Sequence, residues 1–153
     1  MDTATEAAAA GTQRRVDFLL GHYAESHRHP TNEAIHCVAI PLIMLSLLGL
    51  LWSAHPWLAY ATVLGSLVYY ARLSVIFLVV MAMVAAVMLL LVRAMGPAVL
   101  PASIAIFVLG WIAQFVGHRI EGRKPSFFED LQYLLVGPLF VLSLLFRRLG
   151  LQW

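Results

Sequence analysis

The stretch HPTNEAIHCVAIPLIMLSLLGLLW, residues 29–52, decides the fold. Its polar start is followed by a largely apolar run over 34–52, which contains no Asp, Glu, Lys or Arg. About 20 such residues cross the hydrocarbon core of a bilayer. Thr31 can cap the start of this helix, and Glu33 is favourable in its first turn. The stretch therefore predicts a membrane-spanning helix that begins with polar residues.

The composition of the whole chain agrees with a membrane protein. Hydrophobic residues make up 61% of the 153 residues, and charged residues only 12%. A soluble domain carries about 25% charged residues. The net charge of +2 is small and scattered, so no nucleic-acid partner is expected, and the single Cys37 excludes an intramolecular disulfide. We predict an all-α, multi-pass membrane helical bundle.

The apolar runs after the first span indicate further crossings. Residues 57–92 are nearly twice as long as one span and contain Arg72, so we predict two helices joined by a turn at 71–74. A Gly-Pro pair at 96–97 marks the next turn, and 98–117 forms another span. We expect four to five spans in total.

The two ends of the chain are expected to differ from the spans. The Ala-rich residues 1–12 predict a disordered tail, and 13–153 predict a single membrane-embedded helical domain. Within it, 13–28 read as an amphipathic helix lying at the membrane interface. A capping box, S-x-x-E at 126–129, opens a last helix over 127–146, which either crosses the bilayer or re-enters it.

The basic residues predict the orientation, because cytoplasmic loops are rich in Lys and Arg. With the N-terminus cytoplasmic, most of them lie inside, and Arg93 lies outside. The inside group comprises Arg14, Arg15, Arg28, Arg72, Arg119, Arg123 and Lys124. The abundance of Arg and Ala hints at a GC-rich bacterial source, so the expected location is the bacterial inner membrane.

This topology gathers five of the six histidines at one membrane face. They are His22, His27, His29, His36 and His118, whereas His55 falls on the opposite side. For a single histidine at a helix end, an interfacial or capping role is the usual explanation, and it fits His22 and His29. The combination of His27, His36 and His118 with Glu121 is harder to explain in that way.

Helical spacing places polar residues on two stripes. Asn32 and His36 are four residues apart in the first span, while Trp111, Gln114, His118 and Glu121 follow a 3-4-3 spacing in a later one. Gln114 lies inside an apolar run, where a polar side chain normally faces the bundle interior. We therefore expect the two stripes to face each other.

The chemistry of these residues suits a metal. Neutral imidazoles with a carboxylate bind borderline ions such as Fe(II) or Zn(II). At this point the alternatives stay open: an oxygenase, a haem-binding or electron-transfer membrane protein, a zinc-dependent membrane lipid hydrolase, or a structural or transport role. Arg119, Arg123 and Lys124 are by default cytoplasmic anchors, and Glu129 is explained by the capping box.

Two motifs resemble those of the 2-hydroxy fatty acid dioxygenase family, a membrane family long catalogued as a domain of unknown function. The first is H-x-x-P-x-N-x-x-x-H-x-x-x-x-P, formed by His27, Pro30, Asn32, His36 and Pro41. The second is GWIAQFVGH at 110–118, followed by Glu121 and Pro125. The order, the spacing and the apolar spans agree from about residue 16 onward.

The resemblance implies an Fe(II)-dependent enzyme that uses O2 to cleave the C1–C2 bond of a 2-hydroxy fatty acid, giving the acid one carbon shorter. The yeast member of the family acts in phytosphingosine breakdown. The implied metal ligands and catalytic residues are His27, His36 and His118, with Glu121 as a further ligand. The yeast-type pattern places its acidic residue four positions after the last histidine, whereas Glu121 follows His118 by three.

The resemblance also implies roles around the metal. Asn32 and Gln114 would orient the imidazoles, and Arg119, Arg123 or Lys124 would attract the substrate carboxylate from the cytoplasmic face. A 2-hydroxy fatty acid has its polar end at headgroup level and its tail among lipid chains, so a site at the helix ends suits it.

Overall fold

A computed structural model describes residues 14–122 and 133–153, and every regular element in these ranges is helical. The α-helices are α2 (Arg15–Ala24), α3 (Pro30–Ala54), α4 (Pro56–Ala71), α5 (Val75–Ala94), α6 (Val99–Glu121) and α8 (Val136–Leu149). A 3₁₀ turn, Gly96–Ala98, precedes α6. The predicted all-α fold is confirmed, as is the division of 57–92 into two helices with a turn at 72–74.

Three segments are long and apolar enough to cross a membrane: Pro30–Ala54, Val75–Ala94 and Gly96–Glu121. The 16 residues of α4 and the 14 residues of α8 make shorter helices. At 1.5 Å per residue α4 is only about 24 Å long, against a hydrocarbon thickness of about 30 Å. The described residues thus hold three full-length candidate spans and two shorter helices.

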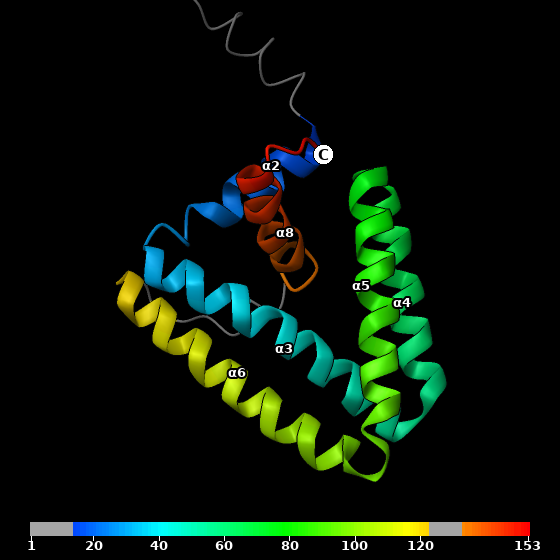
Figure 1. Cartoon of the computed structure of the whole chain (residues 1–153). Coiled ribbons are helices and arrows are strands. Elements are labelled where there is room, and N and C mark those ends of the chain that lie inside the picture. Colours follow the sequence, from blue (N-terminus) through cyan, green and yellow to red (C-terminus); the bar gives the residue numbers. More distant parts are fainter. Residues whose placement is uncertain (1–13, 123–132) are drawn as a thin grey trace, which may run out of the picture.

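The helices form two pairs joined at one end (Figure 1). Helices α3 and α6 lie side by side and antiparallel, and they make the most extensive contact in the molecule. Helices α4 and α5 form a second pair, which meets α3 near its C-terminal end. Helices α2 and α8 pack on each other beside the N-terminal part of α3.

Small residues on α6 let its backbone approach α3. Ser103, Gly110 and Gly117 recur every seven residues and are buried against α3. A Cβ atom on Gly110 would come within 2.7 Å of Ile43 Cγ1, and one on Gly117 would overlap Asn32 Oδ1. Small residues are favoured at helix contacts in membranes because packing, rather than hydrophobic exclusion, drives association there. This contact fixes the register of the two helices that carry the polar stripes.

Two sequence predictions near the start of the chain are wrong. The first helix ends at Ala24 rather than at 28. Helix α3 already begins at Pro30, so its N-cap is His29, whose Nδ1 accepts a hydrogen bond from the backbone N–H of Thr31 at 3.2 Å. Proline suits the first helical position because it has no N–H to satisfy there.

The last helix stays at the end of the bundle that holds α2. It begins beside α3, where Gly137 packs on Ile40, one turn from His36. It ends beside the start of α5, where the Phe146 and Phe77 rings stack with centroids 5.7 Å apart. The predicted bounds of 127–146 are wrong at both described ends, because residues 133–135 form a turn and the helix continues to Leu149. At 14 residues, α8 is shorter than the about 20 residues that cross a hydrocarbon core.

Candidate metal centre

Three histidines from three separate segments converge at one end of the α3–α6 pair. His27 lies in the turn between α2 and α3, His36 in the second turn of α3, and His118 in the last turn of α6. A potential ligand atom from each lies within 4.8 Å of the other two. The ring centroids are 4.3 to 5.4 Å apart, and all three side chains are buried.

Backbone carbonyls fix the orientation of two imidazoles. His27 Nδ1 lies 2.8 Å from the carbonyl oxygen of Tyr23, and His36 Nδ1 lies 3.0 Å from that of Asn32. A carbonyl oxygen can only accept, so each Nδ1 donates its proton to this bond. The lone pair of each ring is then on Nε2, which is the atom available to a metal.

Two aromatic rings, those of Tyr23 and Phe140, pack on His27. The Tyr23 ring stacks on the His27 ring with centroids 4.2 Å apart and an angle of 9° between the planes. Phe140 of α8 packs on both rings. Its ring centroid lies 5.1 Å from that of Tyr23 and 5.7 Å from that of His27. Sequence reasoning missed both residues. Tyr23 had one available signal, because it precedes a candidate ligand by one helical turn.

Glu121 contacts the turn before α3. Its carboxylate accepts hydrogen bonds from the backbone N–H groups of Arg28, at 3.0 Å, and His29, at 2.8 Å. It also accepts one from the Asn32 amide at 3.1 Å. The first N–H groups of a helix lack partners within the helix and carry partial positive charge, so a carboxylate is favourable there. Direct ligation by Glu121 stays a prediction.

Asn32 connects this carboxylate to the histidines. Its side chain is fully buried next to Gly117, and its backbone carbonyl accepts the hydrogen bond from His36 Nδ1. The contact of Asn32 with Glu121 also confirms that the two polar stripes face each other. Gln114 is buried one turn before His118 and lines a small cavity with Trp111. Its orienting role stays a prediction.

The remaining histidines have local partners. His22 Nδ1 lies 3.0 Å from the hydroxyl of Tyr133, and His29 caps α3. His55 lies at the other end of α3, where its Nδ1 accepts a hydrogen bond from the Trp57 N–H at 3.3 Å and caps α4. These positions agree with leaving the three residues out of the site.

Of the basic residues expected to attract the substrate, Arg119 is exposed on α6 beside His118. Arg123 and Lys124 lie outside the described residues, as do the tail 1–12 and the capping box at 126–129. These predictions therefore stay as the sequence made them.

The donor set fits a borderline divalent metal. Two imidazoles carry the proton on Nδ1, the potential ligand atoms of all three histidines lie within 4.8 Å of one another, and burial shields them from bulk water. Three nitrogen ligands suit Fe(II) or Zn(II) and leave coordination positions open. Ring centroids 4.3 to 5.4 Å apart leave no room for a porphyrin between any two of the histidines, which argues against bis-histidine haem.

Comparisons with known proteins point to one family. The sequence model described as "2-hydroxy-palmitic acid dioxygenase Mpo1-like" matches residues 14–149, a range that contains the three histidines and Glu121. The 2-hydroxy-palmitic acid dioxygenase MPO1 of Saccharomyces cerevisiae is 30% identical over 145 residues, which cover 86% of this chain and 79% of that protein. No solved structure matches.

Proposed function

The chain belongs to the Mpo1-like family, and we propose that it is a membrane-embedded, Fe(II)-dependent dioxygenase of 2-hydroxy fatty acids. The product would be the fatty acid one carbon shorter. The observation that carries the proposal is the buried group of His27, His36 and His118, whose potential ligand atoms lie within 4.8 Å of one another. The name of the yeast relative supplies the substrate class.

Iron held by the three imidazoles would supply the redox chemistry by which O2 cleaves the bond between C1 and C2. With O2 as sole oxidant, the balanced reaction converts a 2-hydroxy acid and O2 into the shorter acid, CO2 and water. No further reductant is required. Oxygen uptake and release of CO2 should therefore run in equal amounts.

The role of the surrounding residues is to fix the orientation of the histidine rings and to shield them from water. The carbonyls of Tyr23 and Asn32 fix two ring orientations, and the Tyr23 and Phe140 rings cover His27. Outer partners of metal-binding histidines matter because their loss commonly weakens metal binding by about 10- to 100-fold. Glu121 ties the end of α6 to the turn that presents His27 and to Asn32.

The substrate would meet the site at headgroup depth, with O2 and the bilayer as further partners. The histidines lie at the end of the bundle where α3 starts and α6 stops, and exposed Arg119 can attract a carboxylate there. Arg147 and Arg148, at the end of α8, lie on the same side as α2. This adds to the basic residues on that side, supporting a cytoplasmic N-terminus, in the inner membrane if the source is bacterial.

The test is the metal content of detergent-purified protein, prepared without oxygen and supplied with Fe(II). We expect about one iron per chain in the wild type, held by the three-histidine group, and none in His36→Ala. The matched control is His55→Asn, which removes a histidine at the opposite end of α3 while keeping a good N-cap residue.

Other outcomes separate the alternatives. Iron together with oxygen uptake on 2-hydroxy acids supports the dioxygenase. Zinc in place of iron, with turnover that is independent of oxygen, would favour the lipid hydrolase. A Soret band would favour haem. Absence of metal from the wild type would leave the histidines with a structural role and overturn the proposal.

A further inference from the structure

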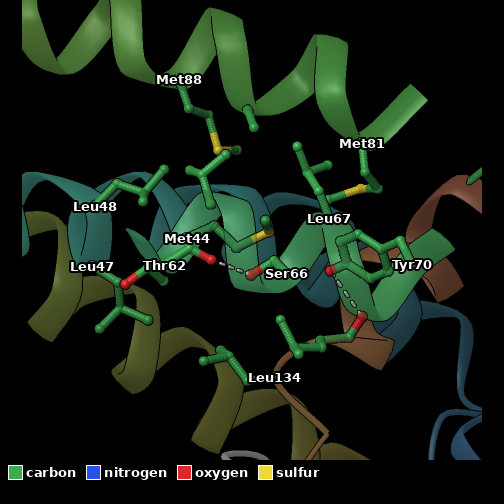
Figure 2. Close-up of a pocket in the computed structure, with 13 residues that line it drawn as sticks. Met44, Leu47, Leu48, Thr62, Ser66, Leu67, Tyr70, Met81, Met88 and Leu134 are labelled. Atoms are coloured by element: carbon green, nitrogen blue, oxygen red, sulfur yellow. Dashed lines mark hydrogen bonds between the residues drawn. The ribbon is translucent and has the colours of Figure 1, made fainter. Parts of the chain in front are cut away.

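A second, apolar cavity lies away from the histidines, between α3, α4 and α5 (Figure 2). Its volume is about 80 Å³, and Met44, Leu48, Leu67 and Met88 are among the residues that line it. The cavity is only partly enclosed, since Thr62 in its wall is exposed. A molecule from the surroundings of the bundle can therefore enter it.

Among the described residues that line the cavity, the hydroxyl groups are already engaged in hydrogen bonds. Three hydroxyls line it, and each donates its proton to a backbone carbonyl. The Thr62 hydroxyl donates to Leu58 at 2.8 Å, the Ser66 hydroxyl to Thr62 at 2.8 Å, and the Tyr70 hydroxyl to Leu135 at 3.1 Å. A ligand in this cavity is thus hydrocarbon, since an apolar cavity of this kind does not stabilise water.

A smaller cavity lies next to residues that neighbour the metal centre. It is about 20 Å³ in volume, and a neighbour of each histidine lines it. Tyr23 stacks on His27, Ile40 lies one turn from His36, and Gln114 lies one turn from His118. Leu134 lines both cavities and therefore stands between them.

The route has the length of an acyl chain. The wall that α3 contributes runs from His36 past Ile40 and Met44 to Leu48 at one-turn intervals. At 1.5 Å per residue these 12 steps along the helix cover about 18 Å. Half of the ~30 Å hydrocarbon core, which one lipid chain spans, is about 15 Å. A long fatty acid with its polar end at the histidines would end in the larger cavity.

We propose that the cavity between α3, α4 and α5 is the acyl-chain site, which receives the distal end of the 2-hydroxy fatty acid after the chain passes Leu134. The proposal rests on the proposed function for the identity of the ligand. Under this proposal, the cavity determines which acyl-chain lengths the protein accepts. The same hydrocarbon could come from a bilayer lipid, so the test separates a bound acid from bulk lipid.

The first experiment narrows the cavity. Ala85 of α5 lines it, whereas the neighbouring Ala86 is exposed on the other face of the helix. In Ala85→Phe, kcat/KM should fall about tenfold or more for long saturated 2-hydroxy acids and stay unchanged for short ones, because each displaced methylene is worth about tenfold or more in discrimination. Ala86→Phe should match the wild type. An unchanged chain-length profile in a folded Ala85→Phe would overturn the proposal.

The second experiment uses only the wild-type protein, so it depends neither on turnover nor on the folding of a variant. Full-length wild type in nanodiscs is irradiated with a fatty acid that carries a diazirine at its terminal carbon, and the labelled residues are mapped by mass spectrometry. We expect label on cavity residues such as Met81 and Met88, removed by excess unlabelled long-chain acid. Label confined to exposed positions such as Val87, and insensitive to competitor, would mean bulk lipid only and would overturn the proposal.

The two hypotheses fail differently. If no 2-hydroxy acid is oxidised but competitor-sensitive label still maps to the cavity, the proposed function is wrong and the acyl site stands. If turnover is observed but neither the Phe variant nor the label reports on the cavity, the proposed function stands and the acyl site is wrong.

Discussion

The two helix pairs of this molecule are built on opposite principles. In the α3–α6 pair, glycines and Ser103 bring the backbones together, and buried polar groups such as Asn32 and His36 lie in the contact. In the α4–α5 pair, α4 buries only Ala59 and Tyr70 among its residues, and methionines border an open cavity.

The difference is what the two proposed ligands, a metal and an acyl chain, would require. Metal ligands must keep their geometry within a few tenths of an ångström, so the helices that carry them are locked by steric fit and hydrogen bonds. Hydrocarbon has no directional contacts, and methionine adapts its shape to irregular neighbours. Substitutions in the first pair should therefore cost function steeply, whereas those in the second that conserve volume should be tolerated.

The largest effect is expected from His118→Ala. Loss of one of three ligands should abolish iron retention and turnover while membrane insertion is unchanged. Thermal unfolding gives an independent measurement. A metal at a hundred times its Kd stabilises the folded state by about 2.7 kcal/mol, so a chelator should lower the Tm of wild type but not of the variant. Full activity in His118→Ala would refute the metal assignment.

The next largest effect is expected from Gly117→Val. The added side chain would overlap Asn32 Oδ1 and press toward His36, so α6 must move away from α3. We expect a loss of about 1–3 kcal/mol in stability and iron affinity weakened about 10- to 100-fold. The matched control is Gly65→Val, since nothing lies within 4 Å of a Cβ on Gly65. Equal effects of the two substitutions would erase the proposed contrast between the pairs.

An intermediate effect is expected from Glu121→Gln, which distinguishes a clamp from a ligand. Glutamine keeps the shape but loses the charge that accepts three hydrogen bonds from Arg28, His29 and Asn32. Hydrogen bonds to charged groups contribute about 1.5–3 kcal/mol, so iron binding should weaken without disappearing. If Glu121→Gln lost iron as completely as His118→Ala, Glu121 would have to be a direct ligand rather than a residue that only holds the turn before α3. Glu25→Gln, at an exposed position, is the control.

The smallest effect is expected from Met88→Leu in the wall of the apolar cavity. A swap that conserves volume usually costs less than about 1.5 kcal/mol. Tm and iron content should stay near wild type, and the chain-length profile of turnover should shift at most slightly. A loss of iron in this variant would mean that the two helix pairs are coupled more tightly than their packing indicates.

The sequence could predict the convergence of the histidines because membrane topology is a strong constraint. Once His36 begins one span and His118 ends another, antiparallel helices bring them to the same face, although they are 82 positions apart. Helical spacing then indicated which faces meet, as the contact between Asn32 and Glu121 confirms. The geometry of antiparallel helices was therefore enough to predict that His36 and His118 converge.

Other features could not be predicted from spacing. The wrong N-cap arose because a Thr-x-Glu pattern resembles a helix start, while the proline before it sets the start earlier. The packing of Tyr23 and Phe140 on His27 depends on where α8 lies in the bundle, and no local sequence signal encodes that position. The cavity behind Leu134 was invisible, because lining and lipid-facing residues of α5 are equally apolar.

The hydrogen bonds from Glu121 to the turn before α3 also have a consequence for biosynthesis. At about 5–20 residues per second, the ribosome needs roughly 4–16 s to extend the chain from His36 to His118, 82 positions later. During that interval His27 and His36 are already made, but the carboxylate that fastens their turn is not. The site can therefore close only after α6 has been made. Under the proposed function, metal capture would then report that the helices around the site are in place.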